Sequence, residues 1–255
     1  MFGLTNRDYA VLLLEEVDLE AQMLAVRDIL RRNNAADEAL DREIDAMRER
    51  ATKASGDYGM HLENRWVDHL HGSVFQDAAH SMAAIGMLAP MLESLFVAIF
   101  RGIAGFRPPI APVTPTGPRA VHVGDPDFWD PHFVYGARGK SKDISRGIVQ
   151  LAESTGLASY LPADYGRSLD ALFKYRNKMF HHGFEWPKPE RQKFEQLIID
   201  KAWPAEWFDR STSAGETWII YMSDVQIKHA MTEIDAILEG TGRFVLTHYP
   251  ARDPG

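Results

Sequence analysis

The longest apolar stretch of the chain, residues 82–100, reads MAAIGMLAPMLESLFVAIF. Its length is close to that of a membrane span, but it contains Glu93, Pro90 would kink a helix there, and no second segment of this kind accompanies it. A helix that is apolar all round is also typical of the centre of a helical bundle. We therefore predict a buried central helix over about residues 76–103, and we expect no membrane among the partners of this protein.

The N-terminal part of the chain, residues 5–56, is rich in Leu, Glu, Ala and Arg at helical spacing. Four apolar residues recur at intervals that suit one face of an amphipathic helix: Leu12, Val17, Leu24 and Ile29. Asn33-Asn34 is expected to end this helix. A second helix over residues 35–54 is mostly charged, which indicates a solvated face or an arm packed on a partner. We assign residues 1–72 to an N-terminal helical arm or extension.

Residues 106–131 have a different composition, with many prolines that cannot continue a helix. We interpret them as a proline-rich inserted loop or lobe, because Val121, Val123, Phe128 and Trp129 provide apolar area to bury. Helical patterns follow over residues 141–154, 162–182, 190–202 and 224–238, and residues 217–223 suit one short strand or a buried turn. The predicted fold is all-α: an antiparallel helical bundle over residues 73–240 with this insertion, and a tail over residues 241–255.

Composition limits the classes of function. The 255 residues suffice for one large domain or two small ones, and they include no cysteine, which excludes disulfides and thiolate metal sites. The net charge of −8 argues against broad, non-specific binding to nucleic acid but leaves room for a local basic cleft. The start of the chain has a short apolar run and no cleavage pattern, so we expect no secretory signal and a cytoplasmic protein.

The segment YRNKMFHHG, residues 175–183, places an arginine on an apolar helix face. On a helical wheel of residues 162–182, one arc holds the apolar residues Leu169, Leu172, Phe173, Met179 and Phe180. Arg176 falls in the middle of that arc. Because a guanidinium does not deprotonate in proteins, a buried one must be paired or must face a polar cavity.

The neighbours of Arg176 suggest a polar site beside this helix. Asn177 and His181 are four residues apart, so their side chains are neighbours, and the arginine is long enough to reach them. Gly183 is expected to end the helix in the left-handed conformation. His181 then lies in the last turn, where the helix dipole favours an imidazolium.

These residues resemble a known family. The sequence RNKMFH is similar to the R-x4–6-H motif of HEPN domains, and the resemblance covers about residues 164–183. HEPN domains are α-helical bundles that usually dimerise through the motif helix, and many are metal-independent endoribonucleases. Residue by residue, Arg176 and His181 match the catalytic pair, and Asn177 matches the polar position after the arginine. His182 satisfies the same motif with one more intervening residue, so the choice of histidine stays open, although the wheel favours His181.

The resemblance implies a metal-free cleavage of RNA by attack of the 2′-hydroxyl, with no cofactor. One histidine cannot easily serve as both base and acid, so the composite site would require a homodimer. Lys174 and Lys178 would attract the RNA backbone. Such a protein would be a toxin or defence protein, with an antitoxin or other partner protein. Glu93 is expected either to pair with Arg176 as a purely structural ion pair or to hold it in position for catalysis.

Two other interpretations of the chain remain. It is either a non-catalytic HEPN-like module that binds RNA, a nucleotide or a partner protein, or a helical bundle unrelated to HEPN in which Arg176 is structural. The densest histidine region contains no His pair four residues apart with a carboxylate, so we expect no metal site among His61, His69, His71 and His80. The tryptophans at 186, 203, 207 and 218 suit either stacking platforms for bases or the core, and the large area of each favours the core.

Overall fold

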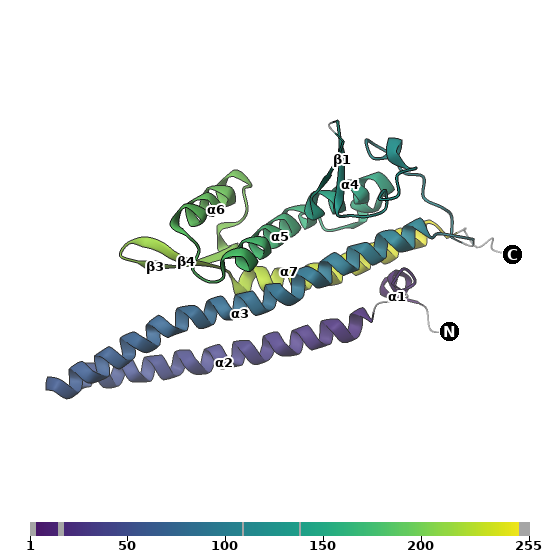
Figure 1. The fold of residues 1–255 in the computed structure, drawn as a ribbon. Coiled ribbons are helices and arrows are strands. Elements are labelled where there is room, and N and C mark those ends of the chain that lie inside the picture. Colours follow the sequence, from purple (N-terminus) through teal and green to yellow (C-terminus); the bar gives the residue numbers. More distant parts are fainter. Residues whose placement is uncertain (1–3, 15–17, 109, 138, 250–255) are drawn as a thin grey trace. The chain divides into compact units, whose positions relative to one another are not determined.

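The computed structural model describes residues 4–14, 18–108, 110–137 and 139–249. This part of the chain is mostly α-helical, as the sequence predicts (Figure 1). Its helices are α1 (Asn6–Val11), α2 (Leu19–Lys53), α3 (Gly56–Ala104), α4 (Ile144–Thr155), α5 (Tyr165–His182), α6 (Lys188–Asp200) and α7 (Asp224–Thr247). Two antiparallel hairpins accompany them: β1 (Phe133–Gly136) with β2 (Gly139–Lys142), and β3 (Phe208–Ser213) with β4 (Glu216–Met222). Of the two alternatives for residues 217–223, the strand is therefore correct.

The chain divides into two compact units, each assembled from separate segments. The first unit comprises Met1–Gln22, Leu88–Lys174 and Lys228–Gly255, and the second comprises Met23–Met87 and Tyr175–Ile227. The contiguous domains that we predict from the sequence, with boundaries at residues 72 and 240, stay a prediction.

In the first unit, the C-terminal part of α3 supplies much of the core. Its buried residues are Leu88, Ala89, Met91, Leu92, Leu95, Phe96, Ile99, Phe100 and Ile103. The ring of Phe106, directly after α3, stacks on that of Phe244 in α7 at a centroid distance of 6.4 Å. Phe244 and Val245 are buried, which explains why α7 continues to Thr247 instead of ending near residue 238. The predicted tail is therefore helical up to Thr247, and residues 250–255 lie outside the described residues.

Helix α3 is longer than predicted, because it begins at Gly56 rather than near residue 76, and it continues through Pro90. By length and composition it is the one helix of the described residues that is apolar enough to cross a membrane, with a mean hydropathy of 1.9 in its most apolar window. Within the protein, 56% of that window is buried. A core helix of a soluble protein has the same composition, so this feature is weak evidence for a membrane.

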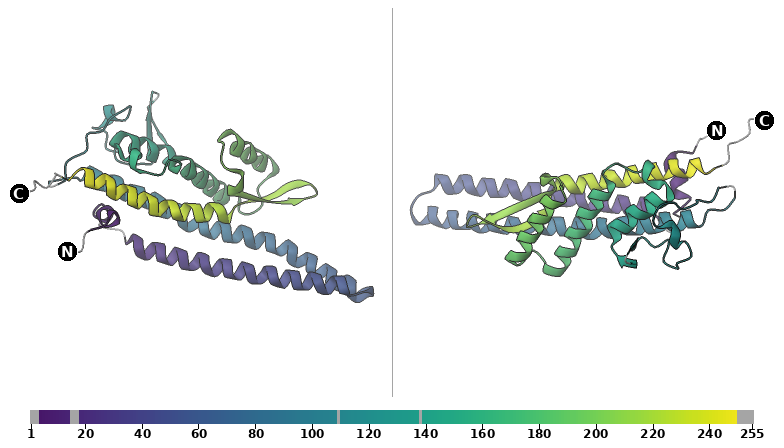
Figure 2. Two further views of the ribbon diagram at one scale, coloured as in Figure 1. Left: turned by 180° about the vertical axis from the view of Figure 1, so that it is seen from behind. Right: turned by 90° about the horizontal axis from the view of Figure 1, so that it is seen from above.

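In the second unit, α2 and α3 form a helical hairpin with residues 54–55 between them (Figure 2). The break predicted at Asn33-Asn34 is wrong, because α2 passes through both residues. Asparagine is only mildly unfavourable inside a helix, and neither Gly nor Pro follows it.

The apolar face predicted for the N-terminal helix is also wrong. Leu24 is 59% exposed and Ile29 is 40% exposed, and Leu12 lies outside α2 altogether. The buried residues in the first part of α2 instead follow the helical spacing of four, three and four: Leu19, Met23, Val26 and Leu30. Ile44 is buried further along the same helix. Val17 lies outside the described residues.

The second unit also contains an aromatic core beside the β3–β4 hairpin. The fully or nearly fully buried rings are Tyr175, Trp186, Phe194, Trp203, Trp207 and Phe208. The rings of Trp186 and Phe194 meet edge to face at 5.1 Å, and those of Phe194 and Phe208 do so at 5.3 Å. Three of the four tryptophans considered as stacking platforms are therefore core residues, and Trp218 alone among them is half-buried.

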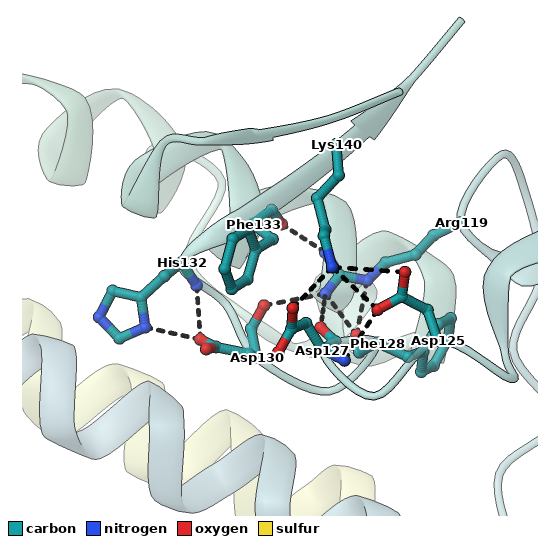
Figure 3. Close-up of polar contacts among 8 residues, drawn as sticks. All are labelled: Arg119, Asp125, Asp127, Phe128, Asp130, His132, Phe133 and Lys140. Atoms are coloured by element: carbon teal, nitrogen blue, oxygen red, sulfur yellow. Dashed lines mark hydrogen bonds and ion pairs between the residues drawn. The ribbon is translucent and has the colours of Figure 1, made fainter. Parts of the chain in front are cut away.

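Residues 105–108 and 110–132 of the first unit contain turns and one short 3-10 helix, η1 (Ala120–His122). The side chain of Arg119 connects these turns, because its guanidinium is completely buried and donates to backbone carbonyls (Figure 3). Nε lies 2.8 Å from Phe128 O, and Nη1 lies 2.7 Å from Phe133 O. Of the four residues expected to be buried here only Phe128 is, since Trp129 is half-buried and Val121 and Val123 are 81% and 52% exposed.

Candidate functional site

The C-terminal end of α5 has the geometry that the sequence predicts. The helix ends at His182, and Gly183 follows in the left-handed conformation with a φ of 69°. The N–H of Gly183 donates to the carbonyl of Met179 at 2.8 Å, which caps the last turn. Because a glycine has no Cβ, it adopts this conformation without the steric cost that another residue would incur. His181 and His182 therefore lie in the last turn, next to the negative end of the helix dipole.

Arg176 and Asn177 are in direct contact. The Nε–H of Arg176 donates to Asn177 Oδ1 at 3.2 Å, and Asn177 is exposed. Arg176 is half-buried rather than fully buried. The reason is that Ser168, Ala171 and Tyr175 are also buried, which turns the centre of the buried face of α5 away from Arg176. The guanidinium therefore sits beside the apolar stripe, close to water.

The two candidate histidines differ in exposure. His181 is exposed and His182 is half-buried, and their ring centroids are 6.5 Å apart. Helical spacing places His181 one turn after Asn177. Phe180, which we expected on the buried face, is 64% exposed. It lies in the last turn, beyond the last buried residue of the stripe, Met179. The end of α5 therefore presents an imidazole and a phenyl ring to solvent.

Of the two lysines expected to attract RNA, Lys178 is engaged in an ion pair. Its ammonium contacts the carboxylate of Glu190 in α6, and Lys193 lies 2.8 Å from the other oxygen of that carboxylate. The two lysines, Lys178 first, lower the pKa of Glu190 to about 2. Lys174 is half-buried on the same helix as Lys178. The positive charge of Lys178 is thus partly neutralised before any ligand arrives.

Glu93 belongs to the first unit, where it forms an ion pair that the sequence did not suggest. Its Oε1 lies 2.8 Å from Nε2 of His132, while Nδ1 of the same ring lies 2.6 Å from Asp130 Oδ1. Burial lowers the pKa of His132, but the hydrogen bonds to Glu93 and Asp130 outweigh it, so the pKa is raised above its usual value. Arg176 belongs to the second unit, and its predicted pairing with Glu93 stays a prediction.

The other histidines do not gather around a metal position. Among the described residues, no group of three or more His, Asp or Glu side chains is arranged to hold an ion. His80 is buried and bonds the carboxylate of Asp37, so it links α3 to α2. His71 contacts the rings of Phe75 and Trp218.

Comparison with known proteins identified no match. No protein-family model matches this chain, and neither a curated protein nor a solved structure does. The resemblance of residues 164–183 to HEPN domains therefore stays a prediction from the sequence.

Proposed function

We propose that this protein is a HEPN-like, metal-independent endoribonuclease that cleaves RNA by attack of the 2′-hydroxyl on the adjacent phosphate. The observation that carries the proposal is the contact of Arg176 Nε with Asn177 Oδ1, one helical turn before the exposed His181. A cation, an amide and an imidazole are thus placed along one helix end that is open to solvent. These groups can bind a phosphate and transfer a proton.

The chemistry assigns a role to each group. One imidazole removes the proton of the 2′-hydroxyl, and a second one protonates the leaving 5′-oxygen. Arg176 stabilises the charge that builds on the phosphoryl oxygens, because its planar fork binds two of them at once. Asn177 orients the guanidinium through the contact at 3.2 Å. The products carry a 2′,3′-cyclic phosphate and a 5′-hydroxyl.

The second imidazole comes from a second copy of the chain in this proposal. A two-fold dimer through α5 brings His181 of both copies to one cleft. The exposure of Phe180, at 64%, supports this arrangement, because the ring adjoins His181 and gains from being covered by a partner helix. Size measurement in solution tests the dimer, and Phe180→Glu is expected to shift it to monomers.

The wider architecture and setting form part of the same proposal. Residues 73–240 would form an antiparallel HEPN-type bundle, with residues 106–131 as an inserted lobe and residues 1–72 as an arm. The protein would act in the cytoplasm as a toxin or defence protein whose activity is held in check by an antitoxin or another partner. These expectations rest on the resemblance of the motif alone.

An RNA-cleavage assay in the presence of a metal chelator tests the activity. Wild type is expected to cut single-stranded RNA, and His181→Ala and Arg176→Ala are each expected to reduce the rate by at least 100-fold while keeping the helical circular dichroism spectrum. His61→Ala, at an exposed histidine of α3, serves as the control. His182→Ala decides between the two histidines. A cleavage activity that needs a divalent metal, or that survives both substitutions, would contradict the proposal.

A non-catalytic HEPN-like module is the second candidate. The pairing of Lys178 with Glu190 favours it, because it weakens the positive charge available to a scissile phosphate. In that case wild type and His181→Ala would bind RNA, a nucleotide or a partner protein equally well, and neither would produce cyclic phosphate ends.

A further inference from the structure

The second unit carries a group of aromatic side chains outside its core, which we call the aromatic cluster: His71, Phe75, Phe184 and Trp218. The ring of Trp218 lies 4.8 Å from that of His71 and 5.2 Å from that of Phe75. Phe75 in turn meets Phe184 edge to face at 6.1 Å. The cluster thus joins α3, strand β4 and the turn after α5.

The cluster differs from the neighbouring aromatic core in its exposure. Trp186, Phe194 and Phe208 are all buried, whereas His71 is exposed and the other three members of the cluster are half-buried. The indole N–H of Trp218 donates to the carboxylate of Glu185, which holds the ring in one orientation. Fixed aromatic rings that remain partly in water are suited to receive another flat ring.

One member of the cluster, Phe184, follows the candidate histidine His182 by two residues. Trp186 Nε1 donates to the carbonyl of Gly183 at 2.9 Å, and Arg191 donates to the carbonyl of Trp186 at 2.6 Å, so this turn is well held. Two peptide units separate His182 from Phe184, and their Cα atoms are therefore at most about 7 Å apart. A nucleotide next to a phosphate at the histidines is within reach of these rings.

The charge of this region matches a polyanion. Residues 175–193 contain five Lys or Arg and two Glu, together with both candidate histidines, in a chain whose net charge is −8. Each of the two glutamates is already engaged, Glu190 by Lys178 and Lys193 and Glu185 by Trp218. Glu216 of β4 also pairs with Lys188 at 2.6 Å, so five positive and three negative charges leave a local excess of two positive charges. An apolar protein partner would not require this excess of positive charge, whereas a single strand of RNA requires both the charge and the flat rings.

We propose that the aromatic cluster is a base-stacking platform that binds unpaired nucleotides of single-stranded RNA beside the phosphate held at the end of α5. Trp218 supplies the main stacking surface, and Phe184 connects it to the site. The biological role of the platform rests on the proposed ribonuclease function. The binding of RNA to the platform can nevertheless be measured without any cleavage. It selects unpaired RNA, because bases in a duplex are stacked on each other and cannot reach the rings.

Binding to non-cleavable probes tests the platform. The probes are a fluorescein-labelled 2′-O-methyl hexa-adenylate, an abasic 2′-O-methyl strand of the same length, and the hexa-adenylate paired to its complement. Wild type is expected to bind the first at least tenfold more tightly than the other two. The abasic strand carries the same phosphate charge and the duplex carries more, so a preference for the single hexa-adenylate must come from stacking. This comparison needs no variant, so it does not depend on whether a substitution disturbs folding.

Variants then locate the binding. Trp218→Ala is expected to weaken binding of the hexa-adenylate roughly 10- to 100-fold and to leave the abasic strand unaffected, while Trp218→Phe keeps most of the affinity. Tyr58→Ala is the matched control, because Tyr58 is an exposed aromatic residue of the same helix as His71, about 20 Å away along α3. In a cleavage assay, Trp218→Ala is expected to raise KM and to leave kcat within about twofold.

These outcomes test the base-stacking platform independently of the proposed ribonuclease activity. Loss of base-dependent binding in Trp218→Ala supports the platform even if wild type cuts no RNA. Equal binding of abasic and adenylate strands, no binding at all, or an unchanged affinity in Trp218→Ala would overturn the platform, even if wild type proves to be a nuclease.

Discussion

The Nε2 atom of His132 lies 2.8 Å from Oε1 of Glu93, and its Nδ1 atom lies 2.6 Å from Asp130. The ring of His132 thus connects the end of the proline-rich segment to the apolar helix α3. Glu93 is the only carboxylate in the apolar stretch of residues 82–100, and its partner His132 belongs to the same unit.

The first prediction concerns the pH dependence that follows from His132. The pKa of His132 is raised in the folded protein. Its contribution to stability is therefore complete at pH values below the pKa of the unfolded state, near 6.5, and is lost as the pH rises through the pKa of the folded state. Wild type is expected to lose more stability than His132→Gln when the pH rises from 6 to 8. Thermal unfolding at several pH values measures this difference, and parallel curves for the two proteins would contradict it.

The second prediction concerns Arg119, whose guanidinium is buried among carbonyl groups and lies 4.7 Å from the ring centroid of Tyr135. Burial lowers its pKa to about 10, so it remains charged at neutral pH. Arg119→Met is expected to reduce the free energy of unfolding by about 3 kcal/mol or more, because several carbonyls lose their donor together. Arg119→Lys is also expected to destabilise, since an ammonium cannot reproduce the planar fork.

Urea unfolding measures both Arg119 variants, with Arg243→Ala as the control. Arg243 is an exposed arginine of the same unit, and it donates to a single carbonyl, that of Tyr160, at 3.2 Å. A loss of less than about 1 kcal/mol in Arg119→Met would show that the proline-rich segment does not depend on this residue.

The third prediction concerns Glu233, a carboxyl of α7 that is 3% exposed. Burial raises its pKa to about 7, an effect that nearby Ser168 opposes and Asp164 reinforces. The folded state therefore holds the proton more tightly than the unfolded state, and this group makes stability fall as pH rises from about 4.5 to about 7. Glu233→Gln is expected to stabilise the protein at pH 8, by at most about 3 kcal/mol, and to have little effect at pH 4.5.

Chemical unfolding at pH 4.5 and at pH 8 checks the Glu233 prediction. Glu239→Gln, an exposed carboxyl on the same helix, is the control and is expected to change stability by less than about 0.5 kcal/mol. If Glu233→Gln destabilises the protein at pH 8, the carboxylate form must have a stabilising role that burial alone does not suggest.

The fourth prediction concerns Glu190, which engages both Lys178 and Lys193. Glu190→Gln removes a negative charge and releases Lys178, so it is expected to strengthen RNA binding by a few fold at low salt. It is also expected to steepen the dependence of affinity on salt concentration, because more phosphates are neutralised on binding. Affinity titrations of a 2′-O-methyl strand between 50 and 200 mM salt measure both effects.

A matched control for Glu190 lies in the same unit, outside the proposed RNA site. Glu49→Gln frees Lys53, whose ammonium pairs with that carboxylate at the C-terminal end of α2. If both substitutions strengthen binding equally, the effect reflects total charge and not the position of Lys178.

Much of the helical content could be predicted from periodicity and from breakers. The end of α5 is the clearest case, since Gly183 after two histidines marks the cap, and the structure has its φ at 69°. Boundaries were less predictable where apolar residues beyond the recognisable pattern are buried, as with Phe244 in α7. The exposure of Phe180 was also missed, because a helical wheel does not show where packing along a helix stops.

The sequence by itself determined that this chain is mostly helical and that an arginine, an asparagine and a histidine share one helix end, because neighbours on a helix are set by local spacing. Only the tertiary structure decided which charges are buried. The helical wheel predicts a buried guanidinium at Arg176, whereas among the arginines of the described residues it is Arg119 that is fully enclosed. Arg119 lies in a segment without periodicity, and the carbonyls of residues 127–133 surround it only once the chain has folded back on itself. Burial depends on such non-local contacts, which local sequence patterns do not encode.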